Sequence, residues 1–353
     1  MSRHFFVSVF ALLILLPTGA ATQQLPDAES WQRDAAWRAS EAVDTSAEKS
    51  RLQQLLKTGD DSAALRLIRE IEVQENWPAP ARERVIYEYV SSLRQETPHV
   101  VGTELIDYLK GFQSSVFIPH EDHPASSVPM FNIKGAAAGV VNGWSRLEAA
   151  FQGAALISEN PSGLGPAYIA EYSIPRKLGL LDALDTASPG QRKIIARISL
   201  KGMEENPELI AVAARAALIN SDLDMLIALA EKGHGMEMHR LFRNSADLFD
   251  TAQSQQLLQA ALRNPWSETA ALAIAQLAPG LAGHEPTEDL LIQILSDPEL
   301  GSTAALALAI HPGPVLITRL QTLADSDDAG LAATRARLAL QMHVSGLNIG
   351  AQR

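Results

Sequence analysis

The feature that most constrains the fold of this chain is a pattern that recurs along its last third, between residues 206 and 342. An Asn or Asp, followed by Pro in three of the five cases, stands before an Ala-rich apolar segment. The second of these five marks matches the pattern least well, and its position is taken partly from the spacing of the marks beside it. A period of this size is typical of one supersecondary unit repeated along the chain. The marks are Asn206-Pro207, the vicinity of Gly235, Asn264-Pro265, Asp297-Pro298 and Asp327-Asp328, spaced by 29, 29, 33 and 30 residues.

Each unit has the composition of a pair of helices. The segments LLQAALRNPWSETAALAIAQL and LLIQILSDPELGSTAALALAI both run from a Leu-rich stripe, through a turn that contains Pro, into an Ala-rich stripe. Small Ala side chains let two helices approach closely, while Leu side chains fill the space between them. A single pair cannot bury its apolar face alone, so neighbouring pairs must stack. The sequence therefore predicts an all-α fold in which stacked helical hairpins form an α-solenoid.

These two segments resemble HEAT repeats, in particular the short variety of about thirty residues. The resemblance covers residues 206–342 and implies stacking and the binding of other proteins. HEAT repeats usually carry an Arg a few residues into their second helix, where this sequence has Ala270 and Thr303. Only Arg215 and Arg335 come near that place, so a regular ladder of charges between repeats is left open.

The N-terminus has the order of a secretory signal. A short polar head, Arg3-His4, precedes an apolar run over residues 5–16, and small residues follow Pro17. As a helix the run is about 18 Å long, too short for a hydrocarbon core of about 30 Å. We therefore predict a cleaved signal peptide at residues 1–21 and a periplasmic or secreted protein. No other stretch is apolar and long enough to span a bilayer, so we expect no stable membrane insertion after cleavage.

Composition narrows the class of partner. The chain has no Cys, so an exported form cannot use disulfides and depends on its core for stability. It carries 41 acidic and 29 basic residues, a balance that does not favour nucleic acid or anionic lipid, which both need clustered Lys and Arg. The expected partner is another envelope protein or a peptide, and the sequence leaves the oligomeric state open.

The chain before the repeats divides into helical and irregular regions. Helical stripes with short links fill residues 22–111, which predicts antiparallel packing of neighbouring helices. The helical period is lost from residue 112 to residue 133, where residues 116–118 and 130–133 are expected to be short strands or extended pieces of a β-hairpin-like insertion. The predicted segments are a signal peptide at 1–21, an N-terminal helical region at 22–111, an irregular segment with helices at 112–188, HEAT-like repeats at 189–345 and a tail at 346–353.

A helix is expected to follow the insertion. Its apolar face includes Val140, Trp144, Leu147 and Phe151, which keep the helical period. Trp144 and Phe151 are suited to lining a groove, but burial in the core explains their spacing more simply. Core positions are therefore the prediction.

The strongest polar cluster lies in the insertion, at His120, Glu121, Asp122 and His123. Two imidazoles separated by two residues can share a zinc ion, and Glu121 can complete the ligand set. The pattern differs from H-E-x-x-H, in which two His one helical turn apart face the metal, and prolines on both sides oppose a helix here. The alternative is a solvated bend in which the rings diverge or one ring caps a backbone group, and we expect this alternative.

A second cluster, GHGMEMH at residues 233–239, combines thioether and imidazole groups that suit Cu(I). The alternative is structural: the two glycines form a turn, and Met238 begins the apolar face of a helix, where Met fills gaps in the core. Two Met and two His fall short of a repeated Met-rich tract, so the structural alternative is the prediction.

Motifs for catalysis are missing from the sequence. It has no G-x-S-x-G elbow, no Cys nucleophile and no glycine-rich nucleotide loop. The S-x-x-K match at residues 46–49 has no partner motif, and we interpret it as chance. We therefore expect a non-enzymatic scaffold that binds a protein or peptide in the cell envelope. The alternative is a metal-dependent hydrolase, or a metal-binding protein, that uses His120 and His123.

Overall fold

The computed structural model describes residues 29–350, except 97–101, 124, 311 and 327–329, so the predicted signal peptide lies outside the described residues. The described chain is all-α apart from one small sheet, as predicted. It divides into two compact units with a border between Val141 and Asn142, so the predicted boundaries after residues 111 and 188 fall inside the units. Among the described residues, no helix combines the length and the hydrophobicity needed to cross a membrane.

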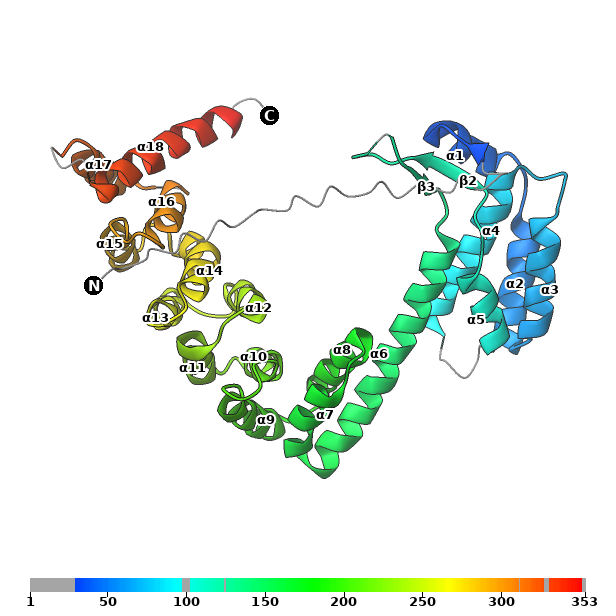
Figure 1. Cartoon of the computed structure of the whole chain (residues 1–353), viewed down its shortest axis with the longest axis horizontal. Coiled ribbons are helices and arrows are strands. Elements are labelled where there is room, and N and C mark those ends of the chain that lie inside the picture. The colour runs from blue at the N-terminus through cyan, green and yellow to red at the C-terminus, as the bar shows by residue number, and fades with distance from the viewer. Residues whose placement is uncertain (1–28, 97–101, 124, 311, 327–329, 351–353) are drawn as a thin grey trace, which may run out of the picture. The chain divides into compact units, whose positions relative to one another are not determined.

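The first unit combines short helices with the sheet (Figure 1). Local signals define its helices: the Asp60 carboxylate caps α3 (Asp61–Glu72) by accepting a hydrogen bond from the backbone N–H of Ala63, and Gly59, with a φ of 69°, ends α2 (Ser46–Thr58). The elements are β1 (Glu29–Ser30), α1 (Arg33–Glu41), α2 (Ser46–Thr58), α3 (Asp61–Glu72), α4 (Ala79–Ser92), the 3-10 helix η1 (Leu93–Gln95), α5 (Thr103–Lys110), β2 (Val116–Pro119) and β3 (Ser127–Pro129). Helix α6 (Ile133–Glu159) crosses the border between the units.

The predicted insertion is a β-hairpin that belongs to the first unit. Strand β2 pairs antiparallel with β3 and parallel with the short β1. Val116 and Ile118 of β2 form a small core with Ala36 of α1, so the sheet packs against the helices that precede it. The expected piece at 130–133 is shorter than predicted, because α6 already begins at Ile133, although the backbone N–H of Met130 still donates to the carbonyl of Val116 after β3 ends at Pro129. A link that buries an apolar side chain, here Phe131, produces the same apolar run as a strand.

The second unit consists of helices packed in two layers (Figure 1). Helices α10, α12, α14, α16 and α18 contact one another in succession, as do α9, α11 and α13. One continuous apolar core extends from Ile157 to Ala339. The elements after α6 are η2 (Pro161–Gly163), α7 (Leu164–Ala170), α8 (Ile174–Asp182), η3 (Ala183–Asp185), α9 (Pro189–Gly202), α10 (Leu209–Ile219), α11 (Leu223–Lys232), α12 (Met236–Ser245), α13 (Thr251–Leu262), α14 (Ser267–Leu277), η4 (Ala278–Leu281), α15 (Glu285–Ile294), α16 (Gly301–Ala309), α17 (Pro314–Ala324) and α18 (Leu331–Gly350).

The recurring marks of the sequence lie in links between helices. Asn206-Pro207 links α9 to α10, Gly235 precedes α12, Asn264-Pro265 links α13 to α14, and Asp297-Pro298 links α15 to α16. The fifth mark, Asp327-Asp328, lies outside the described residues. Helix α9 packs on α10, α13 on α14, α15 on α16 and α17 on α18. The local turn signals therefore separate helices that pack against each other in space.

The core prediction for α6 is wrong for Leu147 and Phe151, which are 40% and 69% exposed. Within the second unit, α6 instead approaches α8 and η3 closely, at places where small residues stand. A Cβ added at Gly153 would lie 2.8 Å from the Cβ of Ala183, and one added at Gly179 would lie 2.0 Å from the carbonyl oxygen of Arg146. Close packing selects the small residues, so the stripe of large apolar side chains is turned away from the core.

Candidate functional site

A pocket of about 380 Å³ opens in the second unit, where three links between helices meet. We call it the Trp266 pocket. Its residues come from the α9–α10 link and the start of α10, from the end of α11 and the link after it, and from the α13–α14 link. The residues that line it are Met203, Glu204, Pro207, Ile210, Glu231, Lys232, His234, Pro265 and Trp266.

Buried hydrogen bonds fix the backbone that carries Trp266. The Nδ2 of Asn264 donates to the carbonyls of Ala230 and Gly233, both at 2.8 Å. The Oδ1 of Asn264 accepts from the backbone N–H of Trp266 at 2.8 Å. The buried hydroxyl of Thr269 donates to the same Gly233 carbonyl at 3.0 Å. Two links separated by more than thirty residues are thereby tied together by a network whose members are all paired.

The indole of Trp266 is 55% exposed although its backbone is fixed. Its ring centroid lies 5.1 Å from that of His234, with the two planes tilted by 42°. Met203 and Ile210, both buried, supply apolar surface to the same pocket. An indole presents a large apolar face together with an N–H donor, a combination suited to molecular contacts.

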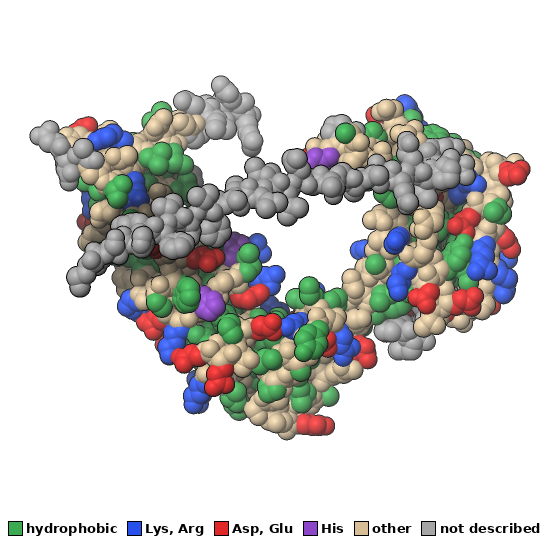
Figure 2. Space-filling view, viewed as in Figure 1, with side chains coloured by type: hydrophobic (Ala, Val, Ile, Leu, Met, Phe, Trp, Pro, Cys, Tyr) green, Lys and Arg blue, Asp and Glu red, His purple; other side chains and the backbone are tan. Residues whose placement is uncertain are grey.

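Charged groups of both signs surround this apolar centre. Arg263 Nη2 donates to the carboxylate of Glu231 at 2.6 Å, while Glu204 and Lys232 are exposed at the pocket edge. Acidic and basic side chains also alternate over α9, α11 and α13 on the face shown in Figure 2. An apolar centre inside a polar, charged rim is the usual anatomy of a protein interface.

The predicted metal residues lie between β2 and β3. The ring centroids of His120 and His123 are 5.2 Å apart, with their planes tilted by 31°. His120 Nδ1 accepts a hydrogen bond from the backbone N–H of Asp122 at 3.1 Å, which is the capping role expected for a bend. Glu121 forms an exposed ion pair with Arg33. Within the described ranges no three His, Cys, Asp or Glu side chains are grouped to hold a metal, and the zinc hypothesis stays a hypothesis.

The residues of the GHGMEMH cluster at 233–239 lie partly in the core and partly at the surface. Gly235, with a φ of 84°, forms the turn before α12, and Met238 is fully buried in the core, as the structural alternative predicts. Met236 is exposed, and His234 belongs to the Trp266 pocket. The S-x-x-K match is also explained by structure, because Lys49 Nζ lies 2.6 Å from the carboxylate of Glu88.

Sequence reasoning missed Trp266, although it stands in one of the two segments compared with HEAT repeats. The available signal was the tripeptide Asn264-Pro265-Trp266, because a Trp in a turn between two apolar stripes belongs to neither core face. No protein-family model, curated protein or solved structure matches this chain.

Proposed function

We propose that this chain is a non-enzymatic, HEAT-like helical-repeat scaffold of the cell envelope that binds a partner protein or peptide at the Trp266 pocket. The observation that carries the proposal is the exposed indole of Trp266 on a backbone fixed by Asn264. Interface hot spots are enriched in Trp, and they bind best where little freedom is lost on binding.

The pocket indicates the chemistry of the partner segment. An apolar or aromatic side chain would enter between Trp266, Pro207 and Ile210, where both surfaces are apolar. The rim offers Glu204 and Lys232, so the flanks of the partner segment meet both signs of charge. A partner that carries charges of one sign only, such as a nucleic acid, would be repelled by part of this rim.

Ion pairs between residues about thirty positions apart in the second unit support the proposed repeat. Arg215 Nη2 donates to Asp185 at 2.7 Å, across thirty residues of sequence. Arg319 pairs with Asp289 at the same sequence separation of 30, and the Arg263–Glu231 pair spans 32 residues. These separations are close to the spacing of the sequence marks, and this agreement supports the proposed repeat.

The envelope location is proposed from the predicted signal peptide alone. N-terminal sequencing of the chain recovered from the envelope fraction should begin near residue 22. Recovery of an intact Met1 would contradict the proposal.

The binding proposal is tested with a random peptide library displayed on phage and selected on the full chain. Selected peptides should share an apolar or aromatic anchor, and Trp266→Ala should weaken their binding by about tenfold or more, as measured by fluorescence polarisation. Trp37→Ala is the matched control, since Trp37 is also exposed but lies in the first unit. Equal binding to the parent and to Trp266→Ala would refute the site.

The alternative function, a metal-dependent hydrolase or metal-binding protein, is favoured only by the approach of the His120 and His123 rings to 5.2 Å. Elemental analysis of untagged protein tests it. Stoichiometric zinc that is lost in both His120→Ala and His123→Ala would promote this alternative over the scaffold.

A further inference from the structure

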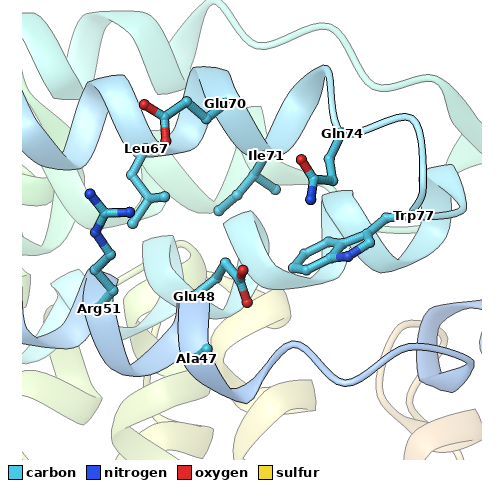
Figure 3. Close-up of a pocket in the computed structure, with 8 residues that line it drawn as sticks. All are labelled: Ala47, Glu48, Arg51, Leu67, Glu70, Ile71, Gln74 and Trp77. Atoms are coloured by element: carbon cyan, nitrogen blue, oxygen red, sulfur yellow. The ribbon is translucent and has the colours of Figure 1, made fainter.

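A second pocket, of about 310 Å³, lies in the first unit between the start of α2, the end of α3 and the α3–α4 link (Figure 3). Its apolar floor is formed by Leu67 and Ile71 of α3, which are both buried. In Figure 3 the carboxylate of Glu48 and the ring of Trp77 project toward each other below Ile71. The side chain of Arg51 projects toward Leu67 at the other end of the pocket.

The charged side chains of this pocket form no ion pairs within the described chain. Glu48, Arg51 and Glu70 have no ion-pair partner among the residues that the structure describes. Glu48 and Arg51 are three residues apart on α2, a spacing that permits pairing, yet they lie at opposite ends of the pocket. The neighbouring cation, Lys49, is already paired with Glu88. The Trp77 end therefore combines an aromatic face and a free carboxylate with no cation beside them.

We propose that this pocket binds a primary alkylammonium group. The ammonium sits between the Glu48 carboxylate and the face of Trp77, where a charge-assisted hydrogen bond and a cation–π contact act together. The methylene chain lies over Leu67 and Ile71 and is removed from water. The side-chain carbonyl of Gln74, which lines the pocket beside Trp77, offers a further acceptor.

Charge balance favours a cation over an anion here. Two carboxylates and one guanidinium line the pocket. An anion drawn to Arg51 would meet Glu70, which lines the same end, whereas a cation beside Trp77 meets only Glu48. The shared chemistry has two sources, the Lys side chain of a partner protein and a free diamine.

Isothermal titration calorimetry on the full chain tests the proposal. The probes are cadaverine and the peptide Gly-Lys-Gly with both ends blocked, and the control ligand is the same peptide with norleucine in place of Lys. Glu48→Gln should weaken the binding of the ammonium probes by about tenfold, because it removes the charge and keeps the shape. Trp77→Leu should weaken it as well, and added salt should lower the affinity.

Matched controls separate this site from general charge effects and from the Trp266 pocket. Glu159→Gln removes an exposed carboxylate elsewhere and should leave binding unchanged, as should Trp266→Ala. Thermal melts verify that Glu48→Gln is folded. Tighter binding of the peptide identifies a Lys side chain as the source, and tighter binding of cadaverine identifies a free diamine. Equal binding of the norleucine peptide, unchanged affinity in Glu48→Gln, or no binding of either ammonium probe would overturn the proposal.

Discussion

The two units treat buried polar groups differently. In the second unit, Asn264, Thr269 and Arg335 are buried, and each reaches backbone carbonyls of an earlier link. In the first unit lie all three buried side-chain atoms that have no hydrogen-bond partner within the described chain. These atoms are Trp31 Nε1, Glu83 Oε2 and Tyr89 OH. Buried polar side chains therefore hold the links of the second unit through hydrogen bonds, whereas the first unit contains buried polar atoms whose burial costs free energy.

Arg335 in the second unit and Glu83 in the first unit illustrate this difference. Arg335 of α18 donates through Nη1 to the carbonyls of Leu295 and Asp297, and through Nη2 to that of Pro298 at 3.1 Å. Glu83 of α4 is also buried, but only its Oε1 accepts hydrogen bonds. That oxygen accepts from the backbone N–H and hydroxyl of Ser115 and from the backbone N–H of Val116. Burial raises the pKa of Glu83, against these hydrogen bonds, which lower it.

The largest effect is expected for Ala305→Asp, which introduces an unpaired polar group into the second unit. Ala305 of α16 is fully buried, so the variant places an unpaired carboxylate between packed helices. We expect the free energy of unfolding to fall by roughly 3–5 kcal/mol. Urea denaturation followed by circular dichroism measures it. Leu306→Asp is the control, because Leu306 is 45% exposed and should cost little. An unchanged midpoint for Ala305→Asp would mean that this helix face is not buried.

A smaller effect is expected for Arg335→Met, which removes the donors and keeps most of the side-chain length. Three carbonyls of the α15–α16 link lose their partner, at a cost of about 2–4 kcal/mol. The space for this guanidinium depends on Gly301, where an added Cβ would lie 2.1 Å from Arg335 Nη1. Arg319→Met is the control, since its partly exposed pair with Asp289 should contribute about 1 kcal/mol or less. Equal losses in the two variants would show that the buried Arg has no special role.

The smallest effect is expected for Glu83→Gln, which should change how the stability of the fold depends on pH. Because burial raises the pKa of Glu83 above its ordinary value of 4.5, the folded chain holds the proton more tightly than the unfolded chain. The stabilisation is complete below that ordinary value and is lost as the pH rises through the folded pKa. The stability of Glu83→Gln should therefore depend less on pH as the pH rises above 4.5, with a change of about 1 kcal/mol or less at acidic pH.

Thermal melts over this range, beside the exposed control Glu75→Gln, isolate the contribution of Glu83. Burial also raises the pKa of Glu72, so the comparison must be between parent and variant rather than within the parent alone. Identical slopes in the parent and in Glu83→Gln would mean that Glu83 does not titrate differently on folding.

The sequence predicted those features that depend on local pattern. Helical periodicity and turn residues indicated the all-α fold and the links at Asn264-Pro265 and Asp297-Pro298, because these signals act over a few residues. The bend in which His120 Nδ1 accepts a hydrogen bond from the backbone N–H of Asp122 is equally local. The pairing of Glu121 with Arg33 spans 88 residues and leaves no trace in local pattern.

The candidate site at Trp266 was not predicted because it also depends on contacts between residues far apart in the sequence. Trp266 is exposed because Asn264 bonds to the carbonyl of Ala230, 34 residues earlier, and this bond sets the direction of the link. Similarly, Leu147 and Phe151 fit an apolar stripe, but the close approach of α8 to α6 buries smaller residues instead. Hydrophobic periodicity identifies a helix face, and only the neighbouring helix decides whether that face is covered.

The layer formed by α10, α12, α14, α16 and α18 has a consequence for fluctuations. Each helix in it packs on the next, so within the described chain α18 has a packing neighbour in the layer on one side only. Opening can therefore begin as fraying at α18 and cost less than opening at α12 or α14, which are held from both sides. Amide protons of α18 should exchange with solvent before those around the Trp266 pocket. Stacking along one direction thus gives a single unit both a slow-exchanging middle and a fast-exchanging end.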